Sequence, residues 1–255
     1  MLFKEKIYLC QDGSGNNYFD VPAFSTRGWH SADRTLGTKV HLRTQSSPWS
    51  LAPVDINEIG SVVMLLPAFT QEQLNNKNVR MHSAPQAVHM EVKIAGPDEN
   101  CIVLVLIWKA VDDQTSALSI ENESSKVVCV RQANINLHGC GVEPETLVVK
   151  CKPNTWQPFG WVDPDMLSEA EVVVADSFTH ADAHQTSARV AVVDLSKVGQ
   201  TFRLPCGQFT YEEVTLAVEA SENGRLLRIV NGSGGGDAAS TTSTSIKPIQ
   251  NEGGK

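Results

Sequence analysis

The residues that could carry out chemistry are few, and the clearest group lies in the stretch HADAH at 180–184. His180, Asp182 and His184 alternate with alanines, so on a strand all three side chains would point to one face. Histidine and carboxylate ligands on one face suit a metal such as zinc. No third convincing ligand lies near them and the first copy has no equivalent, so a polar loop between two strands is the simpler explanation of the pattern. We therefore expect no metal and no cofactor.

Other familiar catalytic and ligand-binding patterns do not occur in the chain. The stretch DGSGNNY at 12–18 offers oxygen ligands at alternate positions, as a calcium loop does. It lacks flanking helices, and Ala23 stands at the twelfth position, where such a loop needs a bidentate glutamate. The sequence contains no GxSxG elbow, Walker loop or HExxH pair, and its seven histidines are scattered. We expect that the protein is not an enzyme.

Composition excludes several classes of partner. The chain has 255 residues and a formal net charge of −8, with no window dense in lysine or arginine. This charge argues against binding to nucleic acid or to anionic membrane surfaces. The longest apolar run, CIVLVLIW at 101–108, is far shorter than the roughly 20 residues of a membrane-spanning helix. We interpret it as a buried strand, and we expect no insertion into a membrane.

The N-terminal residues and the cysteines indicate a cytosolic protein. The opening MLFKEKIYLCQ places charges where a signal peptide needs its apolar run. The six cysteines form no CxxC pair and no regular framework, so they are typical of small buried side chains in a reducing compartment.

Hydrophobic periodicity predicts strands. Apolar and polar residues alternate in HMEVKIAG (89–96) and in EEVTLAVEA (212–220), which makes one face of each strand apolar. Turn formers separate such runs, and the Asn223-Gly224 pair favours a two-residue hairpin. Helical signals are limited to TQEQLNNK (70–77), where Thr70 and Gln73 could form a capping box. The fold class we expect is all-β, with antiparallel sandwiches and few short helices.

The chain also repeats itself. DINEIG at 55–60 matches DLSKVG at 194–199, and in both copies an alternating strand, a Glu-Asn turn and a second apolar strand follow. Upstream, KIYLCQ (6–11) matches KVVCVRQ (126–132), and VPAFSTRGWHSAD (21–33) matches WQPFGWVDPD (156–165). The matched positions, which we expect to be structural, are Gln11 with Gln132, Trp29 with Trp161, Asp55 with Asp194, and Gly60 with Gly199.

This repeat predicts the domain organisation. We expect a first β-sandwich repeat at 1–116 and a second at 117–231. The Gly-, Ser- and Thr-rich stretch 232–255 is expected to be a disordered tail. The second copy opens with ALSIENESS (117–125), which has no counterpart in the first, so we expect the chain to be part of a longer parent protein.

Some distinctive residues have simple structural interpretations. Trp29 and Trp161 are expected in the core, although the aromatic residues of PFGWVDPD (158–165) could instead form an exposed recognition platform. Asp163 before Pro164 predicts a turn. Asn122 stands where a strand enters a turn, so its side chain is expected to bond neighbouring backbone groups.

Taken in order, the phrases IEN, VVCVRQ, LVVKCKP, PFGWVDPD, VVDLSKVG and GRLLRIVN resemble the vacuolar protein sorting thirteen family of bridge-like lipid transfer proteins. The similar region is the adaptor-binding part of that family, also called the SHR-binding domain, and it covers about residues 5–231. The resemblance implies consecutive β-sandwich repeats, each with a characteristic asparagine. Asn122 matches that asparagine, and the first copy has no matching residue.

The resemblance also implies a function. Repeats of this family grip short proline-containing motifs of organelle adaptor proteins and thereby target the lipid-conducting parent protein to membrane contact sites. The expected location is cytoplasmic, peripheral at organelle membranes. Nothing in the chain resembles the lipid-conducting groove, so lipid transfer is not assigned to this chain itself. Two alternatives remain open: a structural spacer repeat without a ligand, and a stand-alone β-sandwich that binds carbohydrate or metal.

Overall fold

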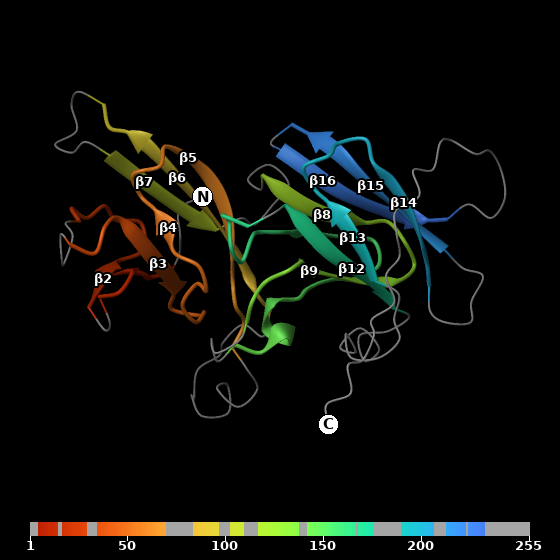
Figure 1. Ribbon diagram of the computed structural model, residues 1–255, viewed down its shortest axis with the longest axis horizontal. Coiled ribbons are helices and arrows are strands. Elements are labelled where there is room, and N and C mark those ends of the chain that lie inside the picture. Colours follow the sequence, from red (N-terminus) through yellow and green to blue (C-terminus); the bar gives the residue numbers. More distant parts are fainter. Residues whose placement is uncertain are drawn as a thin grey trace. The chain divides into compact units, whose positions relative to one another are not determined.

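The computed structural model describes residues 5–14, 17–29, 35–69, 84–96, 103–109, 117–137, 142–166, 168–175, 190–206, 213–222 and 224–232. Strands dominate these residues, and their one helix is the 3-10 turn η1 (Pro144–Leu147). The expected all-β class is therefore confirmed (Figure 1). The helix expected at 70–77 lies outside the described residues, and so does the tail from residue 233 onward.

Contacts divide the chain into two compact units. The first comprises Met1–Ala117, Ile135–Leu147 and Pro158–Met166, and the second comprises Leu118–Asn134, Val148–Gln157 and Leu167–Lys255. The division after Ala117 lies next to the boundary expected from the sequence. Two segments that the repeat assigns to the second copy, 135–147 and 158–166, belong to the first unit.

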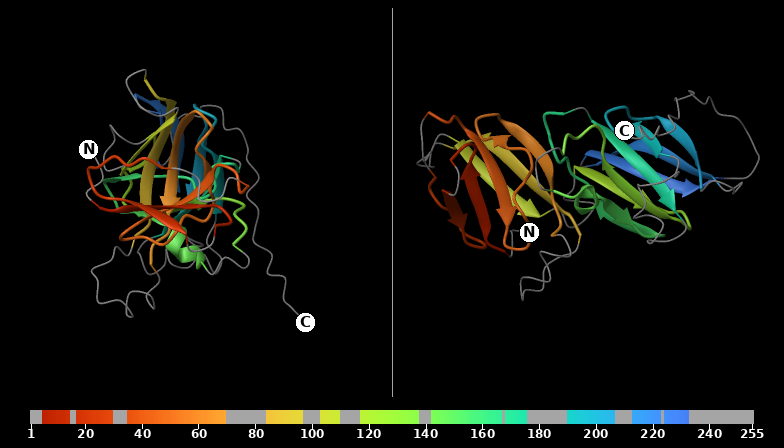
Figure 2. Two further views of the ribbon diagram at one scale, coloured as in Figure 1. Left: turned by 90° about the vertical axis from the view of Figure 1, so that its left-hand side faces the viewer. Right: turned by 60° about the horizontal axis from the view of Figure 1, so that its bottom comes forward.

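The first unit contains two sheets, whose strands lie in separate layers in Figure 2. One sheet has the order β2 (Tyr18–Val21), β1 (Ile7–Gln11), β3 (Lys39–Thr44) and β4 (Val54–Asp55). The other has the order β5 (Gly60–Leu66), β6 (Gln86–Ile94) and β7 (Val103–Lys109). Alternate apolar residues of both sheets form one core, as the alternation predicts. Its buried members are Ile7, Leu42, Met64, Leu66, Val88 and Met90.

The second unit also contains two sheets. One has the order β10 (Val149–Cys151), β9 (Val127–Gln132), β12 (Glu169–Ala175) and β13 (Val190–Asp194). The other has the order β11 (Thr155–Pro158), β8 (Leu118–Asn122), β16 (Gly224–Asn231), β15 (Glu213–Ser221) and β14 (Thr201–Pro205). Ser221 pairs with Gly224, so a two-residue hairpin is present, but Gly224 is the first paired residue of β16 and not a turn residue as the Asn223-Gly224 pair predicted. The β8–β16 pairing is parallel, unlike the antiparallel pairing expected throughout.

The seven strands of the first unit recur in the second with the same topology, and β8 and β11 have no counterpart among the described strands of the first unit, so the tandem sandwich repeat is confirmed. Strands β2, β1, β3 and β4 correspond in order to β10, β9, β12 and β13, and β5, β6 and β7 correspond to β14, β15 and β16. The registers agree as well. Gln11 pairs with Val40 as Gln132 pairs with Ala170. Lys39 pairs with Asp55 as Glu169 pairs with Asp194.

The turns after β2 and β10 also correspond. Phe24 and Asn154 occupy equivalent positions with φ of 54° and 52°. Since few side chains adopt positive φ, the match supports the strand correspondence. In this structural correspondence Pro22 matches Lys152, whereas the sequence alignment matched Pro22 with Pro158. The sequence alignment of VPAF with the stretch at 156–165 therefore differs from the structural one.

Candidate functional site

The open edge of β7 is the most distinctive surface of the first unit. In the described part of the chain, β7 pairs with β6 alone, in the register Val92 opposite Val105 and Met90 opposite Ile107. Its seven residues make it the longest strand whose outer side is left open there. It contains no proline, and its one charged residue is Lys109 at its end, so six consecutive residues lack the prolines and charges that usually protect an edge from further pairing.

In the second unit, β8 covers the corresponding edge. It pairs with β16 in the register Ile120 opposite Leu227 and Asn122 opposite Ile229. Leu227 and Ile229 are each 0% exposed. Their counterparts Val105 and Ile107 are only partly buried against the core of the first unit. Among the residues that the structure describes, the first unit therefore has apolar side chains and no pairing strand at the edge where the second unit has β8.

This edge corrects one expectation from the sequence. The run CIVLVLIW does form a strand, β7, but its residues Val103–Trp108 are half-buried rather than buried. The hydrophobic run alone could not separate an edge strand from a central one. The signal that could have done so is the repeat, because GRLLRIVN has LSIEN as its neighbour and the first copy has no counterpart of LSIEN.

Asn122 is the residue of β8 whose side chain makes the most hydrogen bonds to neighbouring segments of the second unit. It is 0% exposed, and its side-chain amide donates to the carbonyls of Lys126, Cys151 and Lys152 at 2.8, 3.1 and 3.0 Å. Its Oδ1 accepts from the amide and hydroxyl of Ser124 at 3.1 and 2.7 Å. The side chain thus closes the β8–β9 turn, as expected, and also ties β8 to β10 in the opposite sheet. The second role was not foreseen.

The opposite edge of the three-stranded sheet in the first unit is occupied. Trp161 forms a parallel bridge with Met64 of β5. The Trp161 amide donates to the carbonyl of Val63, and the Trp161 carbonyl accepts from the amide of Leu65, both at 2.8 Å. An extended stretch between two prolines, Pro158 and Pro164, thus adds to a sheet edge by main-chain hydrogen bonds.

The expectation that Trp29 and Trp161 are core residues is wrong, because both are half-buried. The buried side chains of the added stretch are Phe159 and Val162, at 0% and 1% exposure. Phe159 packs edge-on against Trp161, with ring centroids 5.5 Å apart.

The turn predicted at Asp163-Pro164 is present. The amide of Asp165 donates to Asp163 Oδ1 at 3.1 Å, a local bond of the kind that Asp side chains make in turns. Pro164 is half-buried, and Asp165 forms an ion pair with Lys39 at 3.2 Å.

The repeated hexapeptides are corners that follow β4 and β13. Asp55 accepts from the Thr38 hydroxyl at 2.6 Å and from the Asn57 amide at 2.9 Å. Asp194 accepts from the Ser168 hydroxyl at 2.9 Å and from the Ser196 amide at 2.9 Å. Each carboxylate therefore caps its own turn and ties it to the start of a neighbouring strand.

The other repeated positions are structural in the same way. The second hexapeptide ends at Gly199, whose φ of 88° favours glycine, and Gly60 ends the first with a φ of 157°. Gln11 is buried and donates to the Gly37 carbonyl at 2.7 Å. Gln132 is buried at the corresponding position of β9.

Hydrogen bonds lower the pKa of both corner carboxyls. The Thr38 hydroxyl and then the Asn57 amide hold the pKa of Asp55 below its ordinary value. Burial alone would raise the pKa of Asp194, but hydrogen bonds from Ser196, Ser168 and Lys197 together outweigh it and hold that pKa well below its ordinary value. These shifts accompany turn geometry and identify no catalytic group.

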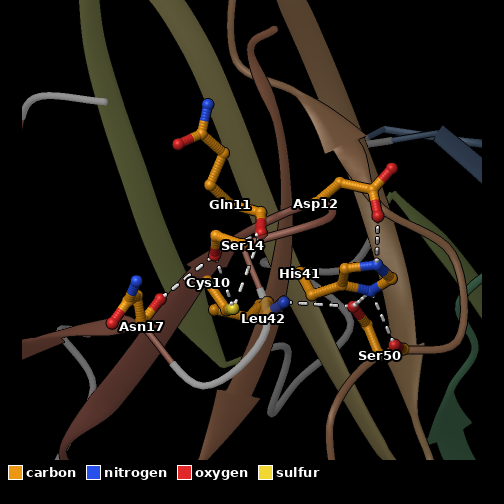
Figure 3. Close-up of polar contacts among 8 residues, drawn as sticks. All are labelled: Cys10, Gln11, Asp12, Ser14, Asn17, His41, Leu42 and Ser50. Atoms are coloured by element: carbon orange, nitrogen blue, oxygen red, sulfur yellow. Dashed lines mark hydrogen bonds and ion pairs between the residues drawn. The ribbon is translucent and has the colours of Figure 1, made fainter. Parts of the chain in front are cut away.

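A grouping of Asp12, His41 and Ser50 resembles a catalytic triad in composition only (Figure 3). Asp12 lies 3.4 Å from His41 Nε2, and the Ser50 hydroxyl lies 3.5 Å from Nδ1. Nδ1 donates to the Ser50 carbonyl at 3.0 Å, so it cannot also take a proton from the hydroxyl. That hydroxyl is buried and accepts from the Leu42 amide. The contacts hold the 45–50 loop against β3.

Two other polar pairs have the same structural explanation. Cys10 is buried and lies 3.3 Å from the Ser14 hydroxyl, which cannot act as its base (Figure 3). On the outer face of β5 and β6, Ser61 is hydrogen-bonded to His89, and the His89 ring stacks on Trp108 with centroids 4.1 Å apart. This arrangement is a cross-strand cluster on an exposed sheet face.

The proposed metal ligands His180, Asp182 and His184 lie outside the described residues. Within the described residues, no three histidine, cysteine or carboxylate side chains are grouped to hold a metal. The four cysteines described there, Cys10, Cys129, Cys151 and Cys206, are buried thiols. No helix in the described ranges is long and apolar enough to cross a bilayer.

The chain matches no protein-family model and no curated protein sequence. The family resemblance therefore stays a prediction from the residues that carry it.

Proposed function

We propose that this chain is a peptide-recognition module in which an extended, proline-containing segment of a partner adds as a strand to the open edge of β7. The observation that supports this proposal is the long apolar edge from Val103 to Lys109, which pairs on one side only in the described structure. Strand addition gives affinity through main-chain hydrogen bonds and specificity through alternate side chains.

Proline suits this mode of binding when it occupies every second position. In the second unit, the Ile229 carbonyl accepts from the Glu123 amide of the covering chain at 2.8 Å. By correspondence, the backbone groups of Val105 and Ile107 face the open edge of β7. Alternate residues of an added strand direct their amides away from the edge, so two prolines one residue apart remove no pairing donor. They also lower the conformational cost of binding, because proline fixes φ.

The chain itself contains an extended segment that adds to a sheet edge by main-chain hydrogen bonds. The stretch from Pro158 to Pro164 is seated on β5 through Trp161, with Phe159 and Val162 buried. A β-sandwich edge of this protein therefore accepts an extended segment flanked by prolines.

The biological role follows from the resemblance. We propose that the module belongs to a vacuolar protein sorting thirteen-like lipid transfer protein and binds adaptor proteins on organelles. Binding would hold the parent protein on the cytoplasmic side of an organelle membrane or at a contact site. Adaptor recognition, rather than lipid transfer, is the part of that role assigned to this chain.

Fluorescence anisotropy tests the proposal. Labelled extended peptides with two prolines one residue apart are titrated with the protein, beside peptides in which both prolines are alanine. Val105→Pro removes an amide that faces the open edge, and Val105→Ala is the matched control because it keeps the amide and loses side-chain volume. We expect saturable, proline-dependent binding that Val105→Pro abolishes and Val105→Ala retains. An absence of binding by the well-folded protein would contradict the proposal.

A further inference from the structure

We propose that the outer face of the sheet formed by β2, β1, β3 and β4 binds an acidic side chain of a partner polypeptide through the guanidinium of Arg43. The group bound is an oxyanion, either a carboxylate or a phosphate monoester. This face lies opposite to the core residues Ile7 and Leu42 of the same strands. Because β7 belongs to the other sheet, the inference goes beyond the proposed function and does not depend on it.

Arg43 of β3 lies among three aromatic rings on this face. Its Cζ atom is 4.5 Å from the ring centroid of Tyr8, 4.9 Å from that of Trp49 and 5.7 Å from that of Tyr18. Tyr8 stands directly opposite Arg43 in the pairing of β1 with β3. The rings of Tyr8 and Tyr18 meet edge to face, with centroids 5.6 Å apart. Cation–π attraction to these rings holds the guanidinium in place.

The hydrogen-bond donors of Arg43 have no partner in the described part of the chain. Its Nε atom is buried and unpaired there, and its guanidinium makes no ion pair with a described residue. Buried donors in folded proteins are nearly always paired, so this one indicates a partner that the described residues do not supply. The planar fork of an arginine presents its donors in the geometry that a carboxylate or a phosphate accepts.

The acidic residue next to the aromatic group is already engaged. Asp20 of β2 stands opposite Tyr8 and forms ion pairs with Lys6 at 3.0 Å and with Arg27 at 3.3 Å. Lys6 also lies 6.0 Å from the centroid of the Tyr8 ring. Lys6, Arg27 and Arg43 against the one carboxylate of Asp20 leave two positive charges in excess. This local charge is complementary to an oxyanion.

The second unit shows that the repeat does not need an arginine at this position to fold. The opposed pair Tyr8 and Arg43 corresponds to the opposed pair Cys129 and Val173. Cys129 and Val173 are buried members of an apolar cluster, at 0% and 1% exposure. The same place in the first unit has a cation among aromatic rings, and the ring of Tyr18 is 56% exposed. Packing of the sandwich alone therefore does not explain Arg43.

A partner polypeptide fits this face better than other anionic ligands do. Tyrosine, tryptophan and arginine are the residues that most often dominate the binding energy of protein–protein interfaces. Small-molecule sites enclose most of the ligand, whereas these rings stand on the outer face of a sheet. A nucleic acid or an anionic bilayer would meet the net charge of −8 of the whole chain. A single acidic side chain meets only the local positive group.

Immobilised peptide libraries test the site. Each library has one fixed central residue in an otherwise random sequence, and the fixed residue is glutamate, phosphoserine, glutamine or serine. The full chain is applied to all four. We expect retention on the glutamate or the phosphoserine library about tenfold or more above that on the two neutral libraries. The stronger of the two acidic libraries identifies the oxyanion.

Substitutions assign this preference to Arg43. Arg43→Gln should abolish it, and Arg43→Lys should lose most of it, because lysine keeps the charge but not the planar fork. Arg27→Gln is the matched control, since it removes the same charge from the same face but from an arginine that already has Asp20 as its partner. It should change the preference by less than about twofold. Circular dichroism shows which variants are folded.

The NMR signal of the Arg43 Nε–H group gives a direct readout in solution. Titration of the full chain with phenyl phosphate and with benzoate should shift this signal saturably and leave that of Arg27 in place. Equal retention on all four libraries, a preference that a folded Arg43 variant keeps in full, or a shift at Arg27 instead of Arg43 would overturn the inference. Val105→Pro should leave the preference unchanged, and its loss in that variant would place the acidic ligand at the β7 edge and overturn the site at Arg43.

Discussion

Asn122 links the two sheets of the second unit through one buried side chain. Its amide serves carbonyls at the start of β9 and the end of β10, and its oxygen holds Ser124 in the turn. Each buried donor or acceptor that is left without a hydrogen-bond partner lowers the free energy of unfolding. The residue therefore matters for folding of the second unit whatever the chain binds.

Asn122→Ala should lower the free energy of unfolding by about 3–4 kcal/mol, since it leaves several buried backbone groups unpaired. Asn122→Asp keeps the shape but directs an ionised carboxylate at three carbonyl oxygens, so it should destabilise the unit at least as much. Urea unfolding followed by circular dichroism measures both. A midpoint that neither substitution moves would show that the side-chain network is not needed for stability.

Asp194 makes the stability of the second unit depend on pH. Its pKa is lower in the folded chain than in the unfolded chain, so ionisation stabilises the fold above the unfolded value of about 4. That stabilisation is lost as the pH falls below this value toward the folded pKa.

Asp194→Asn should therefore reduce the loss of stability on acidification. At pH 7 the variant should be less stable by about 1 kcal/mol, because a neutral acceptor replaces a charged one. Denaturant titrations at pH 7, 5 and 3.5 test this, with Asp55→Asn as the matched change in the first unit. If the free energy of unfolding of Asp194→Asn falls between pH 7 and pH 3.5 as much as that of the unsubstituted protein, the lowered pKa of Asp194 would not be the cause of the acid sensitivity.

At the scale of elements, similar sequence need not give a similar environment. The Gly-Trp pairs at 28–29 and 160–161 match in sequence, but only the second lies against a strand. A Cβ on Gly160 would lie 2.6 Å from the backbone carbon of Met64, whereas one on Gly28 would meet nothing within 4 Å. The close approach of two backbones requires glycine at 160 alone.

Gly160→Ala should therefore push the Trp161 stretch away from β5 and destabilise the first unit by about 2–3 kcal/mol. Gly28→Ala is the matched control and should change stability by less than about 0.5 kcal/mol. Thermal unfolding measures both variants. Equal melting midpoints would mean that the Trp161 bridge contributes little to the unit.

For the whole molecule, the sequence predicted the fold class and the repeat because periodicity and repeated turns are local signals. Asp163 and Asn122 were assigned to turns correctly for the same reason. The sequence could not assign the stretch 158–166 to the first unit, because pairing of Trp161 with Met64 joins residues far apart in the chain. It also missed the open edge of β7, since edge and central strands share a composition of apolar residues.

The open β7 edge is a property of the whole first unit, and amide hydrogen exchange resolved by residue tests it most directly. Val105 and Ile107 are predicted to direct their amides to the open side, so they should exchange faster than Leu104 and Leu106 in the free protein. Saturating proline-containing peptide should slow exchange at Val105 and Ile107. Protection at a different edge, with β7 unchanged, would contradict the account.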